Sequence, residues 1–428
     1  MKKHLLLLLF CCWAAILGAQ TTPGASQQQP IVIINATIHI GNGQVIENGF
    51  IHFDKGKIVA TGTQTTYQSV AGAKTIDAKG KHVYPGFISA NTTLGLTEVD
   101  AVRPTRDFNE VGDLNPNVRS IIAYNTDSKI IPTLRFNGIM LAQTTPQGGR
   151  IPGMSSVVQL DAWNWEDAAY KTDDAIHLNW PEMYRRTGWW AEPGPVEQNK
   201  EYDGNIEKIR DYFKEAQAYA QQNKPATTNL KFEAMKGLFD KSRKLMVHVD
   251  GSREILHALN FTKEFGVDLV IAGGADSWRV TEQLKQFNVP VLLGNVHALP
   301  GAPEDDIDQS YKLPYLLQKE GILIGLTIYG SWEQRNLPFH AGTAAAYGLT
   351  KEQALSAITL NTAKILGIDK QTGSLEPGKD ANLFISLGDA LDMRTNQLEA
   401  AFIQGREVDL SDHQQELYDK FKTKYSGK

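Results

Sequence analysis

Cysteine is nearly absent from this sequence. Of its 428 residues 2 are cysteines, Cys11 and Cys12, and both stand close to the amino terminus. The segment around them has Lys2 and Lys3, then an apolar run, then small residues, which is the layout of a signal peptide. We therefore expect residues 1–20 to be removed on export, which leaves no thiol for a disulfide or for metal binding.

A long apolar run and an excess of positive charge are also missing. After residue 20 no stretch approaches the length of about 20 apolar residues that a spanning helix needs. We expect an exported protein, periplasmic or extracellular, without a membrane span. The 43 Lys and Arg residues are outnumbered by 48 Asp and Glu residues, which gives a formal net charge of −5. We expect no binding to nucleic acid from so acidic a chain.

The two ends of the chain carry β-rich segments. Polar residues 21–30 have no periodicity and indicate a flexible leader. From Ile31 to residue 85, short β-branched runs alternate with Gly and Asn, and Gly56 in the sequence DKGK predicts a hairpin turn. Residues 367–410 repeat this pattern, so we predict that 31–85 and 367–410 form one small β-sandwich domain. A C-terminal helix or tail is expected over 411–428.

The middle of the chain, residues 86–366, alternates short apolar strands with amphipathic helical patterns. This alternation predicts a TIM-like (β/α)8 barrel of the α/β class, whose chemistry gathers at the carboxyl ends of its strands. Thr350 with Gln353 predicts a capped helix start, and Gly367 predicts a helix end. The expected strands are 86–89, 138–142, 245–248, 269–272, 289–293 and 322–327. A tryptophan-rich segment, 160–200, is interpreted as an insertion, either a lid packed on the barrel or a platform for a ligand.

Three passages carry a resemblance to a known family. They are TIDAKGKHVYPGFI (75–88), NTAKILGIDKQTGSLEPGKDANLFI (361–385) and FIQGREV (402–408). Through the residues of these passages and their order along the chain, the sequence resembles the amidohydrolase superfamily, in particular its imidazolonepropionase-like secreted members. The resemblance implies a metal-dependent hydrolase of carbon–nitrogen bonds other than peptide bonds. It also implies metal ligands on barrel strands one (His-x-His), four (Lys or Glu), five and six (His), and eight (Asp).

Most of those ligand positions hold other residues here. The resemblance places the His-x-His pair at Asn91 and Thr93, the sixth-strand histidine at Gly273, and the aspartate at Thr327 or Ile328. Asn and Thr oxygens hold divalent transition metals poorly compared with imidazole. No lysine between residues 202 and 245 stands out for the fourth strand. His248 on the fifth strand is the sole position that keeps the family's residue, and a hydrogen-bonded core histidine is the alternative for it.

The polar residues at the ends of strands five to seven leave two interpretations open. His248, Asp250, Asp276 and His297 could converge into a relocated site for a single divalent metal such as zinc. Alternatively, Asp276 caps the helix that begins near Ser277.

The region after the last strand supplies Arg335 and Asn336 as pocket candidates. Two functions remain as alternatives. One is a divergent carbon–nitrogen hydrolase with a reduced metal site. The other is a non-catalytic pseudoenzyme that binds a small-molecule ligand or an active paralogous amidohydrolase, with a homo-oligomer as a further expectation.

Overall fold

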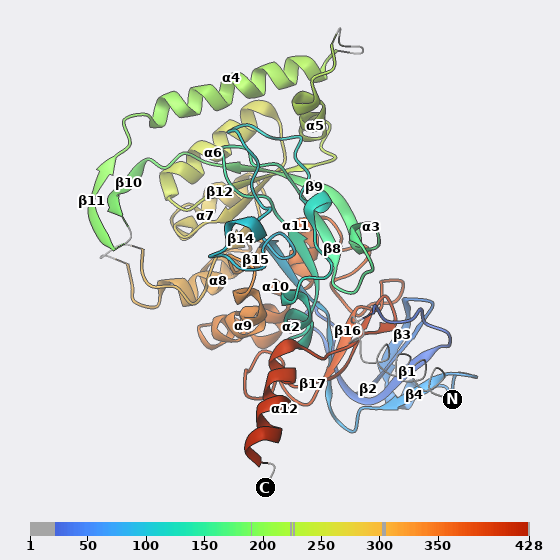
Figure 1. The fold of residues 1–428 in the computed structure, drawn as a ribbon. Helices are drawn as coiled ribbons and strands as arrows, with labels where there is room; N and C mark the ends of the chain where they lie inside the picture. Colours follow the sequence, from blue (N-terminus) through green and yellow to red (C-terminus); the bar gives the residue numbers. More distant parts are fainter. Residues whose placement is uncertain (1–21, 190, 223–224, 226, 302–304, 427–428) are drawn as a thin grey trace, which may run out of the picture.

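The structure is a computed structural model that describes residues 22–189, 191–222, 225, 227–301 and 305–426. Within these ranges it contains two sheets of eight strands and one separate hairpin. Figure 1 shows a small β domain, built from both ends of the chain, beside a larger α/β body. The expected signal peptide, 1–20, lies outside the described residues.

The small β domain unites the two ends of the sequence in one sheet. The strand order is β18-β17-β16-β5-β1-β2-β3, and β4 pairs with β1. β16 from the C-terminal segment pairs antiparallel with β5 from the N-terminal one. Gly56 has φ 78° in the turn between β2 and β3, as its place in DKGK predicts. The strands are β1 (Ile31–His39), β2 (Val45–Asp54), β3 (Lys57–Thr63), β4 (Lys74–Asp77), β5 (His82–Pro85), β16 (Leu383–Ser386), β17 (Leu398–Ile403) and β18 (Arg406–Glu407).

The second sheet forms the barrel, in the order β15-β14-β13-β12-β9-β8-β7-β6. β8 is antiparallel to both of its neighbours, whereas the other neighbouring pairs are parallel. Its strands are β6 (Phe87–Thr92), β7 (Ile139–Thr144), β8 (Met154–Gln159), β9 (Ala169–Asn179), β12 (Lys244–Val249), β13 (Leu269–Gly273), β14 (Val291–Leu293) and β15 (Ile324–Leu326). The architecture is therefore a TIM-like barrel with one reversed strand.

Helices surround the barrel, and one further helix, α12, follows the β domain at the C-terminal end of the chain (Figure 1). They are α2 (Ile130–Phe136), α3 (Trp165–Ala168), α4 (Tyr202–Ala220), α5 (Leu230–Phe239), α6 (Ser252–Phe265), α7 (Thr281–Gln286), α8 (Gln309–Lys319), α9 (Leu337–Ala346), α10 (Lys351–Ala357), α11 (Leu360–Leu366) and α12 (His413–Ser426). Short 3-10 turns are η1 (Gln64–Thr66), η2 (Arg103–Thr105), η3 (Ser120–Ala123), η4 (Ser277–Arg279) and η5 (Glu333–Asn336). The capping box of Thr350 and Gln353 starts α10, and Gly367 at φ 68° ends α11, as predicted. Among helices of the described ranges, none has the length and apolar character that crossing a bilayer requires.

Two barrel strands, β8 and β9, were not among those expected from the sequence. β9 lies inside 160–200, which had been interpreted as an insertion, yet its second half is buried in the sheet between β8 and β12. Polar residues such as Asp174 and His177 in β9 hide its core character from a pattern search. The part that does project from the barrel is a hairpin of β10 (Tyr184–Trp189) and β11 (Glu192–Gln198) (Figure 1).

Two residues of the leader expected over 21–30, Gly24 and Gln27, hydrogen-bond to the folded body. The Gly24 backbone N–H donates to Asp161 Oδ2 at 2.9 Å. The Gln27 side chain donates to the Phe53 carbonyl at 3.0 Å and accepts from the Gly56 N–H at 2.9 Å. These partners come from distant parts of the chain, Asp161 through its side chain and Phe53 and Gly56 through their backbones, and composition alone does not reveal them.

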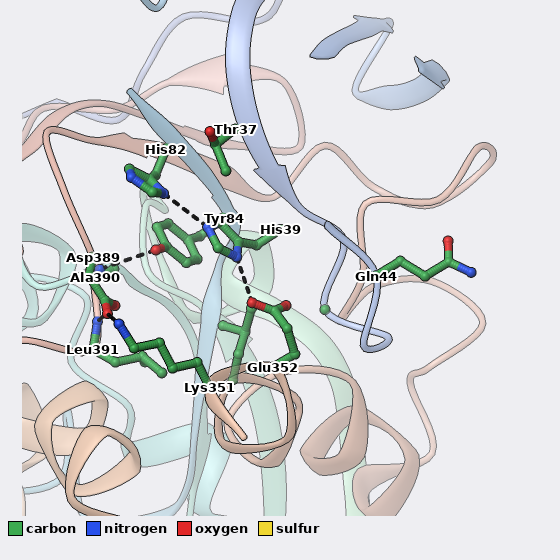
Figure 2. A network of polar contacts seen from close by, with 12 residues as sticks. Thr37, His39, Gln44, His82, Tyr84, Lys351, Glu352, Asp389, Ala390 and Leu391 are labelled. Atoms are coloured by element: carbon green, nitrogen blue, oxygen red, sulfur yellow. Dashed lines mark hydrogen bonds and ion pairs between the residues drawn. The ribbon is translucent and has the colours of Figure 1, made fainter. Parts of the chain in front are cut away.

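Polar and aromatic contacts join the β domain to helix α10 of the barrel (Figure 2). His39 Nδ1 lies 2.7 Å from Glu352 Oε1, and His39 Nε2 lies 3.0 Å from His82 Nδ1. The Tyr84 ring stacks on His39 with centroids 4.2 Å apart. Beside them, Lys351 Nζ pairs with Asp389 Oδ2 at 2.6 Å. These contacts connect distant segments, so they hold the β domain against the barrel.

Candidate functional site

The first barrel strand bends where the family's His-x-His pair would stand. Asn91 has φ 51°, in the left-handed region, and the pairing of β6 with β7 shifts between Ser89 and Thr92. Side chains two residues apart share a face only in a regular strand. The bend therefore removes the geometric basis for treating Asn91 and Thr93 as a ligand pair. Both residues are buried, at 3% exposure each.

A closed hydrogen-bond network connects β7, β8 and β9 inside the barrel. Gln143 Oε1 accepts the Asn91 backbone N–H at 3.1 Å. Gln143 Nε2 donates to Asp174 Oδ2 at 2.8 Å and to Ser155 Oγ at 3.1 Å, and Ser155 Oγ donates to Asp174 Oδ1 at 2.8 Å. Burial raises the pKa of Asp174. The carboxylate oxygens are thus occupied by donors from neighbouring strands.

The last strand is tied to the first by side-chain hydrogen bonds. Thr327 Oγ1 donates to the Ala90 carbonyl. Ser89 Oγ donates to Gln334 Oε1, and Gln334 Nε2 donates to the Ile328 carbonyl. Thr327 and the Ile328 backbone, the positions that the family resemblance gives to an aspartate, therefore take part in closing the barrel.

His248 contacts a second histidine that the sequence analysis missed. His248 Nε2 lies 2.8 Å from His177 Nδ1 on β9, the fourth strand counted from β6. Burial lowers the pKa of His248 to about 4, and burial and then the neighbouring His248 lower the pKa of His177 well below its usual value. The 2.8 Å contact is a hydrogen bond between two neutral rings, one donating and one accepting. The fourth strand is β9, so its ligand position lies before residues 202–245, the region expected from the sequence.

Asp250, Gly273, Gly294 and Tyr329 form a compact group at the ends of β12 to β15. A Cβ on Gly273 would meet Asp250 Oδ1 at 2.6 Å and Tyr329 Oη at 3.2 Å, and a Cβ on Gly294 would meet Tyr329 Oη at 2.9 Å. Both glycines therefore make room for these two polar side chains. Asp250 Oδ1 also accepts the Ala275 backbone N–H at 3.2 Å.

The electrostatics of this group follow from its burial. Burial raises the pKa of Asp250, and the nearby charge of Asp276 adds to that rise. Burial also raises the pKa of Tyr329, and the charge of Asp250 acts in the same direction. Asp250 nevertheless faces open space: it lines a cavity of about 690 Å³. A carboxylate in that position is available to a ligand.

The cavity lies at the carboxyl ends of β12 to β15, the face of a barrel where ligands bind. The polar and charged side chains that line it include Asp250, Asp276, Arg279, Asn295, Asp305 and Tyr329. Its apolar lining includes Leu299, Leu313 and Pro314. The opening combines an apolar wall with a few polar groups, which is the usual composition of a small-molecule site.

The four residues considered for a relocated metal site do not converge. Asp276 Oδ1 pairs with Arg279 Nε at 3.3 Å, and its Oδ2 accepts the Ser252 N–H at 3.4 Å, so it meets the start of α6 and gives η4 no side-chain cap. His297 Nε2 contacts Thr343 Oγ1 at 2.6 Å, and its ring packs on His340. Within the part of the chain that the structure describes, no group of three His, Cys, Asp or Glu residues could hold a metal ion. A catalytic zinc has three protein ligands, so these donors do not fit one.

The two pocket candidates after the last strand lie elsewhere. Arg335 Nη1 donates to the Trp332 carbonyl at 3.4 Å, and its guanidinium lies over the Trp332 ring. Neither Arg335 nor Asn336 is among the described residues that line the cavity. Tyr329 does line the cavity, and it was not predicted from the sequence. Tyr329 stands shortly after the last strand and six residues before Arg335, and this position could have indicated a residue at the barrel mouth.

Comparisons with known proteins agree with this architecture. A model of the amidohydrolase family matches residues 51–408. The imidazolonepropionase of Mesorhizobium japonicum is 25% identical over 366 residues, which is 80% of this chain and 87% of that protein. The amidohydrolase tasK of Hapsidospora irregularis is 34% identical over 119 residues, 25% of this chain and 12% of that protein.

The solved structures point the same way. The crystal structure of an amidohydrolase from Thermotoga maritima MSB8 superposes with a TM-score of 0.76 at 25% identity, covering 89% of this chain and 99% of that one. The family match spans more than half of the sequence and includes the barrel and most of the β domain. The chain belongs to the amidohydrolase family.

Proposed function

We propose that this chain is a non-catalytic member of the amidohydrolase family that binds a small molecule in the mouth of its barrel. The observation that carries the proposal is the group of Asp250 and Tyr329 built around Gly273. A histidine at position 273, as in the family pattern, would have to occupy space that these two side chains fill. The site is therefore organised around different chemistry from metal-activated water.

The polar groups of the cavity favour a ligand that donates hydrogen bonds. Asp250 is an acceptor when ionised, and burial raises the pKa of its carboxyl, with the charge of Asp276 acting in the same direction. An ammonium, amidine or ureido group would supply N–H donors and would lower the free energy of the carboxylate. The apolar wall at Leu299 and Leu313 would cover the rest of the molecule.

A divergent hydrolase with one metal ion is the second candidate. The 2.8 Å separation of His177 Nδ1 and His248 Nε2 favours it, because two imidazole nitrogens stand together, and His177 Nε2 is buried without a partner. Against it, two ligands are fewer than the three that catalytic zinc sites use. The mutual hydrogen bond of the two rings also satisfies the contacting nitrogens without an ion.

Metal content separates the two candidates. The chain is purified without chelators and without a metal-binding tag, and its metal is measured by plasma mass spectrometry. We expect well below one metal ion per chain, also after soaking in zinc and desalting. Near-stoichiometric zinc, manganese or iron that is lost in His248→Gln would refute the non-catalytic proposal and establish the hydrolase candidate.

Ligand binding tests the cavity directly. A panel of small amines, amidines and ureas is screened by the rise in unfolding temperature of the chain. A ligand of this site should lose its effect in Asp250→Asn and keep it in Asp308→Asn, which makes the same charge change outside the cavity lining. A ligand that binds equally to both variants would place binding elsewhere.

We also propose export and an association, which the sequence suggests. The layout of residues 1–20 supports secretion, and amino-terminal sequencing of the secreted protein would locate the cleavage. Light scattering of the purified chain, alone and mixed with an intact paralogous amidohydrolase, would distinguish a monomer, a homo-oligomer and a mixed complex.

A further inference from the structure

The C-terminal helix α12 lies outside the part of the chain that the amidohydrolase family model matches. The family model ends at residue 408, and α12 begins at His413. The start of the helix is fixed: Asp412 accepts the Gln415 backbone N–H at 2.8 Å, and Thr133 Oγ1 of α2 donates to Gln414 Oε1 at 2.8 Å. Beyond this start the helix projects from the body, and none of its residues is buried (Figure 1).

The exposed helix carries a continuous apolar stripe. Leu417, Phe421 and Tyr425 are spaced four residues apart, and Tyr418 lies beside them. Their exposed fractions are 38%, 46%, 73% and 57% in that order. Large side chains arranged in this way on a solvated helix indicate a surface that something else covers.

Two lysines lie closer to the stripe than the acidic residues of the helix do. At 100° per residue, Lys422 and Lys424 flank the apolar stripe on its two sides, whereas Glu416 and Asp419 lie on the opposite face. The ammonium groups of these lysines lie close to stripe residues, at 5.4 Å from the Tyr418 ring and 5.2 Å from the Tyr425 ring. An apolar stripe flanked by cations fits a surface that has an apolar interior and anionic groups at its boundary.

We propose that α12 is an interfacial helix that docks the protein on the surface of an anionic phospholipid bilayer. Leu417 and Phe421 enter the boundary of the acyl region, Tyr418 and Tyr425 lie at headgroup level with their hydroxyls in water, and Lys422 and Lys424 meet lipid phosphates. The helix lies along the surface and does not span it.

A second copy of the chain fits this stripe less well. A two-helix seam needs apolar residues alternately three and four positions apart. Tyr418, Phe421 and Tyr425 keep this spacing for two steps only, and the seam position before them is Gln414, so the repeat is far shorter than the about three to four heptads of a coiled coil. The flanking lysines would also face the lysines of a copy in a parallel pair.

Vesicle sedimentation tests the proposal on the chain from residue 21 onward, since residues 1–20 would themselves bind lipid. We expect binding to vesicles with 30% phosphatidylglycerol in phosphatidylcholine, and weaker binding in high salt, because lysine attraction is screened. Leu417→Asp with Phe421→Asp should weaken binding by roughly tenfold or more, because two charges then face the acyl boundary. Gln415→Asp with Thr423→Asp adds the same charge on the polar face and serves as the matched control.

The sedimentation of three chains, the wild type, the stripe variant and the control, decides the proposal. Binding by the wild-type chain and by the control, with loss in the stripe variant, supports the proposal. No sedimentation of the wild-type chain, or equal binding of stripe variant and control, overturns it. A dimer in light scattering that the stripe variant converts to monomer would also overturn it, because a second copy would then cover the stripe. Circular dichroism and the unfolding temperature of each variant establish that it is folded.

Discussion

Replacing Gly273 with alanine tests whether the mouth of the barrel is built as described. Gly273 has φ 104°, a conformation that costs a residue with a Cβ roughly 1–3 kcal/mol. The new methyl group would stand 2.6 Å from Asp250 Oδ1 and 3.1 Å from the Val249 carbonyl, closer than atoms pack without movement. Relieving such crowding costs about 1–3 kcal/mol more. Because the two costs are relieved partly by the same movement, we expect a loss of about 2–4 kcal/mol in the free energy of unfolding.

A second glycine separates the two causes. Gly266 has φ 67° at the end of α6, and a Cβ there would meet nothing within 4 Å. Gly266→Ala therefore reports the backbone cost alone. The combination of Asp250→Ala with Gly273→Ala removes the oxygen that the methyl group meets. Its loss should be smaller than the sum of the two single losses by about 1 kcal/mol or more, since neighbouring sites couple by 0.5–3 kcal/mol.

Urea unfolding followed by circular dichroism measures these differences, with equal slopes required for a comparison of midpoints. If Gly273→Ala were no less stable than Gly266→Ala, and if its effect simply added to that of Asp250→Ala, Asp250 would not pack against Gly273. The proposed ligand site would then lose its geometric basis. Loss of ligand binding in Gly273→Ala at a temperature where the variant is folded would support the site independently.

Two further predictions concern buried charges. Asp161→Asn leaves Arg135 buried without its anion, because Arg135 Nη1 pairs with Asp161 Oδ1 at 2.8 Å and both side chains are almost fully buried. We expect a loss of about 3–5 kcal/mol in the free energy of unfolding by urea. The Arg135→Met, Asp161→Leu double variant should recover part of it, because Asp161 also accepts the Gly24 N–H and pairs with Arg406; an effect of Asp161→Asn under about 1 kcal/mol would contradict the prediction. Burial lowers the pKa of His340 to about 3, with a smaller contribution from His297. The unfolded chain therefore takes up this proton below about pH 6.5, and stability should fall as pH falls from 6.5 toward 3, by at most about 1.4 kcal/mol per unit. His340→Gln should flatten that dependence, and an unchanged slope would count against it.

The frame of the molecule could be predicted from the sequence because it follows regular patterns. The alternation of β-branched residues with Gly and Asn predicted the strands at both ends, and Gly56 and Gly367 have the left-handed conformations expected of them. The Thr350 capping box was equally readable. The strands β8 and β9 were not predicted, since buried polar side chains such as Ser155, Asp174 and His177 interrupt the apolar runs that mark the other strands.

The candidate site was only partly readable, for a related reason. Asp250 and Gly273 could be identified from the sequence, but Tyr329 and His177 become neighbours of these strand ends only when the barrel closes. His297 was grouped with Asp250, yet the structure turns it toward Thr343 and His340. Strand order decides which side chains meet, and spacing along the chain does not report it.

The three passages that carry the family resemblance lie together in the fold. Residues 75–88 contain β5, residues 361–385 reach into β16, and residues 402–408 contain β18, and these strands belong to the adjacent run β18-β17-β16-β5. Tyr84 of the first passage stacks on Phe384 of the second at 5.6 Å, and Tyr84 and His82 also meet the barrel through His39 and Glu352 (Figure 2). These residues build the joint between the β domain and the barrel. These residues therefore identify the fold family. The strand ends around Asp250 and Tyr329 determine which ligand binds, so the function of this chain has to be inferred from the barrel mouth.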